Sequence, residues 1–207
     1  MAGPSTLGPT REAAGSSPQG PAGARARPYV VAIAALVALQ AIALLAMGRE
    51  PWCTCGYVEL WHGVVESSGN SQHLADWYTF AHVLDGFGSY LALWLVGRAW
   101  PLPLRLTLTT ALAVAWELFE NTDFVIDHYR TATIALGYRG DSIVNSVGDT
   151  LACILGFTLA ARLPLRSSVA LAAATGVVAA WVVRDDPTFM AMLIAPIEAI
   201  KEWQLGA

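Results

Sequence analysis

Two carboxylates stand three residues apart at the end of an apolar run that begins near residue 104. They are Glu117 and Glu120, within the stretch AWELFEN at residues 115–121. A charged side chain deep in a bilayer costs roughly 2.5–3.5 kcal/mol, so two such groups need partners. Because residues three apart share one face of a helix, both can face the same cavity. The pair therefore predicts a polar site within an apolar helix.

The composition of the chain is that of an integral membrane protein. Of its 207 residues, 55% are hydrophobic and 14% are charged, whereas soluble domains carry about 25% charged residues. The formal net charge is -4. We therefore expect the lipid bilayer as a partner and no nucleic acid.

Five apolar segments predict an all-α fold, a polytopic transmembrane bundle of about five helices. The first, residues 29–47, is uncharged and long enough, at 1.5 Å per residue, to cross a hydrocarbon core of about 30 Å. A cleaved signal peptide is the alternative, but its apolar region should span only about 7–15 residues. The other predicted helices are residues 78–97, 104–121, 142–161 and 168–183.

The two ends of the chain differ from this bundle. Residues 1–28 are rich in Gly, Pro, Ala and Ser, so we expect a disordered cytoplasmic tail ahead of a single transmembrane domain at 29–204. Residues 188–203 are apolar but short and are interrupted by Pro196, Glu198 and Lys201. We expect them to form an interfacial helix, and a sixth crossing is the alternative.

The distribution of arginine predicts an orientation in a bacterial inner membrane. Short cytoplasmic loops are enriched in Arg and Lys, so the N-terminus and the turns near 98–105 and 162–166 are expected in the cytoplasm. The acidic loops then face the periplasm. The arginines behind this assignment are Arg11, Arg25, Arg27, Arg98, Arg105, Arg162 and Arg166.

With this topology, the buried polar residues of three helices fall at one depth, near the periplasmic face. Asp141, Asn145 and Asp149 follow one another at a spacing of four and so share one helical stripe. Agreement in depth between separate helices indicates a common chamber. The full set is His82, Asp85, Glu117, Glu120, Asp141, Asn145 and Asp149.

Two kinds of chemistry suit these residues. Neutral His and carboxylate oxygens are ligands for zinc, manganese or iron, so His82, Asp85, Glu117 and Asp149 predict a divalent metal site. Without a metal, closely spaced carboxylates share protons and can act as general acid and base, a role that would extend to Glu120, Asp141 and Asn145. Structural roles are also open, because Asp141 fits a helix N-cap and the deeper acids can hydrogen bond between helices.

The outer loops carry further candidates. Arg130, Arg139 and His73 could contact a phosphate or carboxylate of a substrate, although arginines at this level also meet lipid headgroups. Cys53 and Cys55 lie on the expected oxidising side of the membrane. A disulfide, a redox couple and a metal pair all remain open for them.

The chain contains several long motifs. They are WCTCGYVELWHGVVESSGNSQHLADWYT at 52–79, WELFEN at 116–121, YRGDSIVNSVGDTLA at 138–152, and VRDDPTFMAML and IEAIKEWQ near the C-terminus. With these motifs the chain resembles an uncharacterised family of bacterial multi-pass inner-membrane proteins with a domain of unknown function, and the resemblance covers roughly residues 29–204. It implies a plasma-membrane location and no reaction.

A fainter similarity is to VanZ-like membrane proteins. These pair a helix-borne His with E-x-x-Q and with an Arg ahead of D-x-x-x-N-x-x-G. The corresponding residues here would be His82, Glu117-x-x-Glu120, Arg139 and Asp141-x-x-x-Asn145-x-x-Gly148, and the second Glu departs from the pattern. The similarity implies a site that acts on envelope molecules.

These observations lead to one expected function and two rivals. The first is a periplasmic metal or acid/base site acting on a lipid or lipid-linked envelope substrate. The second is a non-catalytic accessory subunit, whose buried polar residues fix helix packing and whose outer loop docks a membrane-protein partner. The third, a small carrier, is disfavoured because the cytoplasmic half lacks polar groups to continue a path.

We predict that the loop at residues 48–77 is periplasmic and that the turn at 98–105 is cytoplasmic, because arginine holds short loops inside. Alkaline phosphatase, which is active only outside the cytoplasm, should be active when fused after Glu66 and inactive when fused after Trp100. The reverse pattern would overturn the topology.

Overall fold

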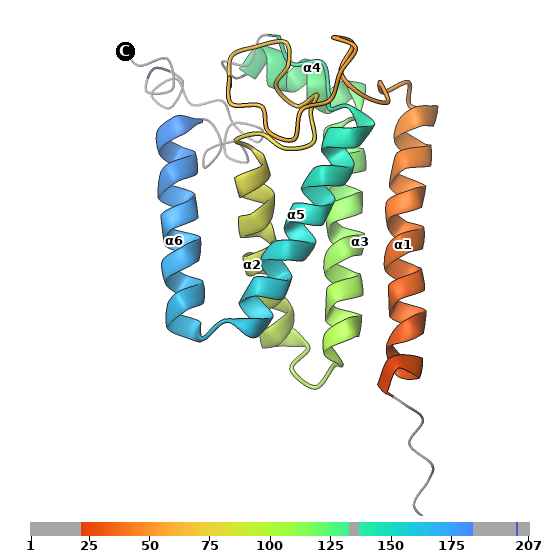
Figure 1. The fold of residues 1–207 in the computed structure, drawn as a ribbon, viewed down its shortest axis with the longest axis vertical. Helices are drawn as coiled ribbons and strands as arrows, with labels where there is room; N and C mark the ends of the chain where they lie inside the picture. Colours follow the sequence, from red (N-terminus) through yellow and green to blue (C-terminus); the bar gives the residue numbers. More distant parts are fainter. Residues whose placement is uncertain (1–21, 133–136, 184–201, 203–207) are drawn as a thin grey trace, which may run out of the picture.

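A computed structural model describes residues 22–132, 137–183 and 202. In these residues the chain is all-α, with five helices long and apolar enough to cross a membrane and one shorter helix. Figure 1 shows how these helices are arranged. The chain is therefore a multi-pass membrane protein. The helices are α1 (Ala22–Ala46), α2 (Thr79–Val96), α3 (Leu102–Glu120), α4 (Asp123–Ala132), α5 (Ile143–Arg162) and α6 (Leu165–Val182).

The fold class and the five long helices agree with the sequence analysis, and two details differ. Helix α1 begins at Ala22, inside the segment expected to be disordered. The segment between the predicted helices 104–121 and 142–161 contains α4, a short helix that buries Val125, Ile126 and Tyr129. Residues 1–21 lie outside the described part of the chain, as does the predicted interfacial segment 188–203 apart from Glu202.

Helix α5 lies at the centre of the bundle. It contacts α2 most extensively and also packs against α1, α3 and α6. In Figure 1 α1 and α3 stand on one side of it and α6 on the other, and α4 lies across the end where α1 and α3 finish. The polar residues of three helices therefore meet around α5.

Glycine allows α2 and α5 to approach closely. A Cβ added at Gly86 of α2 would clash with the backbone of Cys153 and Phe157, and one at Gly156 of α5 would clash with the carbonyl of Val83. Small residues recur on α5 at intervals of four, at 148, 152, 156 and 160, the spacing that brings membrane helices together. This close packing sets the distance between the polar side chains of α2 and α5.

The loop before α2 is fastened to the first turn of α5. The backbone N–H groups in the first turn of a helix have no partner within that helix. Here those of Ile143 and Val144 donate to the carbonyls of Glu50 and Pro51 at 2.8 and 3.2 Å. Ser142 is the N-cap, and its side chain accepts from the N–H of Asn145 at 3.1 Å. This loop, residues 47–78, is called the outer loop below. The outer loop and the central helix therefore form one unit.

We predict that Gly86→Ala lowers the stability of the bundle by about 1–3 kcal/mol, because the added methyl group meets backbone that cannot rotate away. Thermal unfolding in detergent, followed by circular dichroism, measures this. Gly88→Ala on the same helix is the matched control, since a Cβ there has nothing within 4 Å. Equal melting temperatures for both variants would contradict the packing argument.

Candidate functional site

His82 on α2 lies between carboxylates from three directions. Its Nδ1 is 3.5 Å from Oε1 of Glu117 and 3.8 Å from Oδ2 of Asp85. Its Nε2 is 3.8 Å from Oδ2 of Asp149. These distances exceed those of hydrogen bonds. The imidazole and the acids therefore face one another across small gaps.

Glu117 and Asp149, the two buried acids, are each held by a hydrogen bond at the oxygen that faces away from His82. Glu117 is 1% exposed and accepts a hydrogen bond at Oε2 from Ser146 Oγ at 2.6 Å, while its Oε1 has no hydrogen-bond partner in the described residues. Asp149 is 3% exposed and accepts at Oδ1 from Thr79 Oγ1 at 2.7 Å. Each carboxylate is thus held through one oxygen, and its other oxygen faces His82.

A buried amide on α1 extends this network. Gln40 is fully buried and donates from Nε2 to the hydroxyl and the carbonyl of Ser146 at 2.8 and 3.0 Å. Its Oε1 accepts from Thr150 Oγ1 at 2.9 Å. The chain Gln40–Ser146–Glu117 therefore links α1, α5 and α3.

A second group of acids lies nearer the end of α3 and the segment before α5. One oxygen each of Glu117, Glu120 and Asp141 lie within 4.8 Å of one another. Asp141 accepts from Asn121 Nδ2 at 2.7 Å and from Tyr138 Oη at 3.0 Å. Burial nevertheless raises the pKa of Asp141 to about 6, and burial also raises the pKa of Tyr138. Asp141 is therefore a hydrogen-bond acceptor in a buried, acidic setting.

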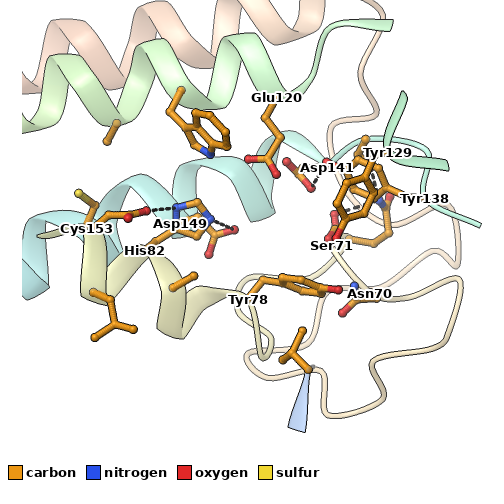
Figure 2. Close-up of a pocket in the computed structure, with 18 of the residues that line it drawn as sticks. Asn70, Ser71, Tyr78, His82, Glu120, Tyr129, Tyr138, Asp141, Asp149 and Cys153 are labelled. Carbon is orange, nitrogen blue, oxygen red and sulfur yellow. Dashed lines mark hydrogen bonds and ion pairs between the residues drawn. The ribbon is translucent and has the colours of Figure 1, made fainter. Parts of the chain in front are cut away.

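Both groups border a cavity of about 1820 Å³. His82, Asp149 and Glu120 face it from α2, α5 and the end of α3, and Asp141 faces it from the segment before α5, as Figure 2 shows. The lining continues over apolar residues of α2 and α3 toward the other end of the bundle and includes Leu93, Val96 and Leu112. The cavity thus has a polar part near the start of α2 and the end of α3 and an apolar part toward the end of α2.

The structure brings most of the predicted site residues together and separates others. His82, Asp85, Glu117, Glu120, Asp141 and Asp149 belong to the cluster. Asn145 does not extend it, because its side chain donates to the carbonyl of His73 at 2.9 Å and so holds the outer loop. The structural role weighed for Asp141 as N-cap is wrong, since Ser142 caps α5 and Asp141 lies outside the helix.

The predicted loop residues also have distinct surroundings. Arg139 is exposed and lines the outer end of the cavity, and Arg130 is exposed in the last turn of α4. His73 is 1% exposed and stacks on His62 with 4.9 Å between ring centroids. Cys53 and Cys55 are joined as a disulfide. The substrate contacts of Arg130, Arg139 and His73 stay predictions.

Sequence comparison identifies the family. A family model described as "Protein of unknown function (DUF2585)" matches residues 44–206. The chain belongs to this family. The expectation of an uncharacterised family is confirmed, and the fainter VanZ-like similarity stays a prediction.

The relatives are UPF0314 proteins. One from Sinorhizobium fredii is 48% identical over 179 residues, which is 86% of this chain and 91% of the relative. One from Paracoccus denitrificans is 48% identical over 181 residues, covering 87% and 93%, and one from Rhizobium etli is 50% identical over 179 residues, covering 86% and 91%. No solved structure matches the chain significantly.

Several residues that orient the site were not foreseen, although the sequence holds a signal for some. Gln40 is an isolated amide within an apolar run, and such residues commonly bond between membrane helices. Thr79 and Ser146 are common residues whose partners depend on how the helices pack. Asp76 accepts from the N–H groups of Ser71 and Tyr78 at 2.8 and 2.9 Å, and burial raises its pKa.

We predict that Ser146→Ala destabilises the protein by about 1–3 kcal/mol, because Glu117 and Gln40 each lose a buried partner. Chemical or thermal unfolding in detergent measures the loss. Ser168→Ala is the matched control, since Ser168 is also buried but its hydroxyl has no partner in the described residues. A loss of equal size in both variants would contradict the proposed network.

Proposed function

We propose that this chain is a membrane enzyme whose His82, Glu117, Asp85 and Asp149 bind a divalent metal ion and act on a lipid or lipid-linked substrate of the bacterial envelope. The observation that carries the proposal is the orientation of the two buried carboxylates. Glu117 and Asp149 are each hydrogen bonded through one oxygen and turn the other toward His82. Protein metal ligands are commonly fixed from behind in this way.

The distances suit a shared ion. Two atoms that each bond to zinc at about 2.0–2.2 Å can lie no more than about 4.4 Å apart. The Nδ1 of His82 lies 3.5 Å from Glu117 and 3.8 Å from Asp85, within this limit. One ligand atom each of His82, Glu117 and Asp149 lie within 4.8 Å of one another, so Asp149 would complete the ligand set after a small shift.

The charge of the cluster also favours a cation. Glu117, Asp149 and Asp141 are all at most 8% exposed. An arginine could neutralise such acids. In the part of the chain that the structure describes, however, the ion pair of Arg49 is with Asp123 and not with these acids. Buried carboxylates without a counter-charge must either take up protons or bind a metal. A bound ion would satisfy the unpartnered Oε1 of Glu117 at the same time.

The shape of the cavity supports an amphiphilic substrate. Its polar end holds the acids together with Arg139, whose guanidinium suits a phosphate headgroup. Its apolar end, bordered by Leu93 and Val96, suits a hydrocarbon chain. A metal bound at His82 would polarise a phosphoryl or carbonyl oxygen at the junction and lower the pKa of a bound water. Hydrolysis or transfer at a lipid headgroup follows from this arrangement.

The location of the site follows from the proposed orientation. With the N-terminus in the cytoplasm of a cell whose inner membrane the chain crosses, the start of α2 and the end of α3 lie on the periplasmic side. The substrate would then be a lipid of the outer leaflet of that membrane.

A second function is favoured by the Gln40–Ser146–Glu117 network. It links three helices through fully buried groups, which is also what a non-catalytic subunit with fixed helix packing would need. In that case the cluster would bind no metal and the protein would copurify with a stoichiometric partner.

We predict that the purified protein binds zinc or manganese and that Glu117→Gln or His82→Ala lowers metal affinity by about 10–100-fold or more, because a ligand is removed. Isothermal titration with each metal and elemental analysis measure this. Lipid analysis of a deletion strain carrying each variant tests activity on an envelope lipid.

Asp127→Asn is the matched control, since Asp127 is an exposed acid on α4 that belongs to neither group of clustered acids. Insertion and melting temperature check that the variants fold. A folded wild-type protein that binds no divalent metal would exclude the metal site. If Glu117→Gln also left the envelope lipids unchanged, the cluster would be structural.

A further inference from the structure

The outer loop contains a second cluster that the proposed metal site does not use. Cys53 and Cys55 form a disulfide that encloses a single residue, Thr54. A ring nitrogen of His73 lies within 4.8 Å of both sulfurs. His73 stacks between Tyr57 and His62, with ring centroids 5.5 and 4.9 Å away. A disulfide therefore lies beside a buried imidazole at the membrane surface.

The hydrogen bond at Nδ1 decides which ring nitrogen of neutral His73 carries the proton. The backbone N–H of Glu59 donates to Nδ1 of His73 at 3.1 Å, so the proton of the neutral ring is on Nε2. Nε2 faces the Glu59 carboxylate at 3.8 Å. A ring whose Nδ1 is already an acceptor has no free lone pair for a metal. His73 is thus suited to donate a hydrogen bond to an anion rather than to bind a metal ion.

The bridge itself does little for stability. A disulfide stabilises mainly by restricting the unfolded chain, and the effect grows with the length of the loop that it closes. Here the loop is the shortest that encloses a residue. Its two ends also differ, because Cys53 is 3% exposed while Cys55 is exposed. Exposed disulfides are the reactive ones.

We propose that Cys53–Cys55 is a thiol–disulfide exchange site that oxidises a dithiol in a polypeptide. A partner thiolate attacks Sγ of Cys55, the bond to Cys53 breaks, and Cys53 leaves as a thiolate. The second thiol of the partner then attacks the mixed disulfide and releases Cys55. The partner is oxidised to a disulfide, and its two protons and two electrons end on Cys53 and Cys55.

His73 acts here as a positioning residue. A ring nitrogen of His73 lies within 4.8 Å of both sulfurs, so a turn of its Nε2–H from the Glu59 carboxylate toward the departing thiolate of Cys53 would stabilise that thiolate and make the pair a better oxidant. The choice of a polypeptide rests on the exposed apolar side chains that flank the pair in the chain. Trp52 and Tyr57 are 55% and 56% exposed, and Leu60 is 79% exposed. Such a rim favours an extended peptide over a small hydrophilic thiol.

The test uses the full-length protein in lipid nanodiscs with Cys153→Ser, which removes the third, buried cysteine. The probe is a synthetic peptide with a C-x-x-C dithiol, and mass spectrometry follows the oxidation of the peptide and the reduction of the protein. We expect stoichiometric transfer, faster than with reduced glutathione at equal thiol concentration. A disulfide that resists excess peptide would overturn the proposal, and equal rates with glutathione would overturn the choice of a polypeptide.

Single-cysteine variants identify the attacked sulfur. Cys53→Ser leaves the exposed Cys55 and should react with Ellman's reagent about tenfold faster than Cys55→Ser, which leaves the buried Cys53. Equal or reversed rates would overturn the assignment. His73→Gln should make the reduction potential of the pair more negative, while His128→Gln on α4, the matched control, should leave it unchanged. An unchanged potential in His73→Gln would exclude the role of His73.

Discussion

The close approach of α2 and α5 is the constraint on which the rest of the structure depends. Gly86 and Gly156 let the two backbones touch, and no larger residue fits at either position without a shift. His82 lies one turn before Gly86, and Asp149 lies two turns before Gly156. The contact therefore sets the gap of 3.8 Å between Nε2 of His82 and the carboxylate of Asp149. A wider separation of the helices would leave two isolated polar groups in an apolar bundle.

The buried polar side chains behind the site form a chain of hydrogen bonds. Gln40 holds Ser146, Ser146 holds Glu117, and Glu117 keeps one oxygen for His82. In a low-dielectric setting an unsatisfied polar atom is costly, so the free Oε1 of Glu117 stands out among Gln40, Ser146 and Glu117, whose other side-chain polar atoms are hydrogen bonded. The network explains why a long apolar helix such as α1 carries an amide. It also separates groups that orient the site from groups left to bind a ligand.

The sequence predicted the helices well because length and hydropathy decide which segments can cross a bilayer. It also placed Glu117, Asp149 and His82 at one depth, since depth follows from position along each helix. The rotation of each helix about its axis and the contacts between side chains were harder to predict from the sequence. Asn145 shares a stripe with Asp149 in sequence, yet it bonds to the outer loop. The partners of Thr79 and Ser146 depend on helix packing, although the spacing of small residues on α5 was a signal for that packing that the sequence analysis did not use.

The first turn of α5 connects the two sites. Asn145 holds the carbonyl of His73, and Ser142 donates through its hydroxyl to the carbonyl of Gln72 at 3.0 Å. One turn further along the same helix, Ser146 and Asp149 orient the cluster around His82. The outer loop cannot move away from the membrane without breaking bonds to the helix that carries these groups. The loop therefore belongs to the architecture of the membrane site, and a change in its conformation would be transmitted to α5 through hydrogen bonds rather than through apolar contact.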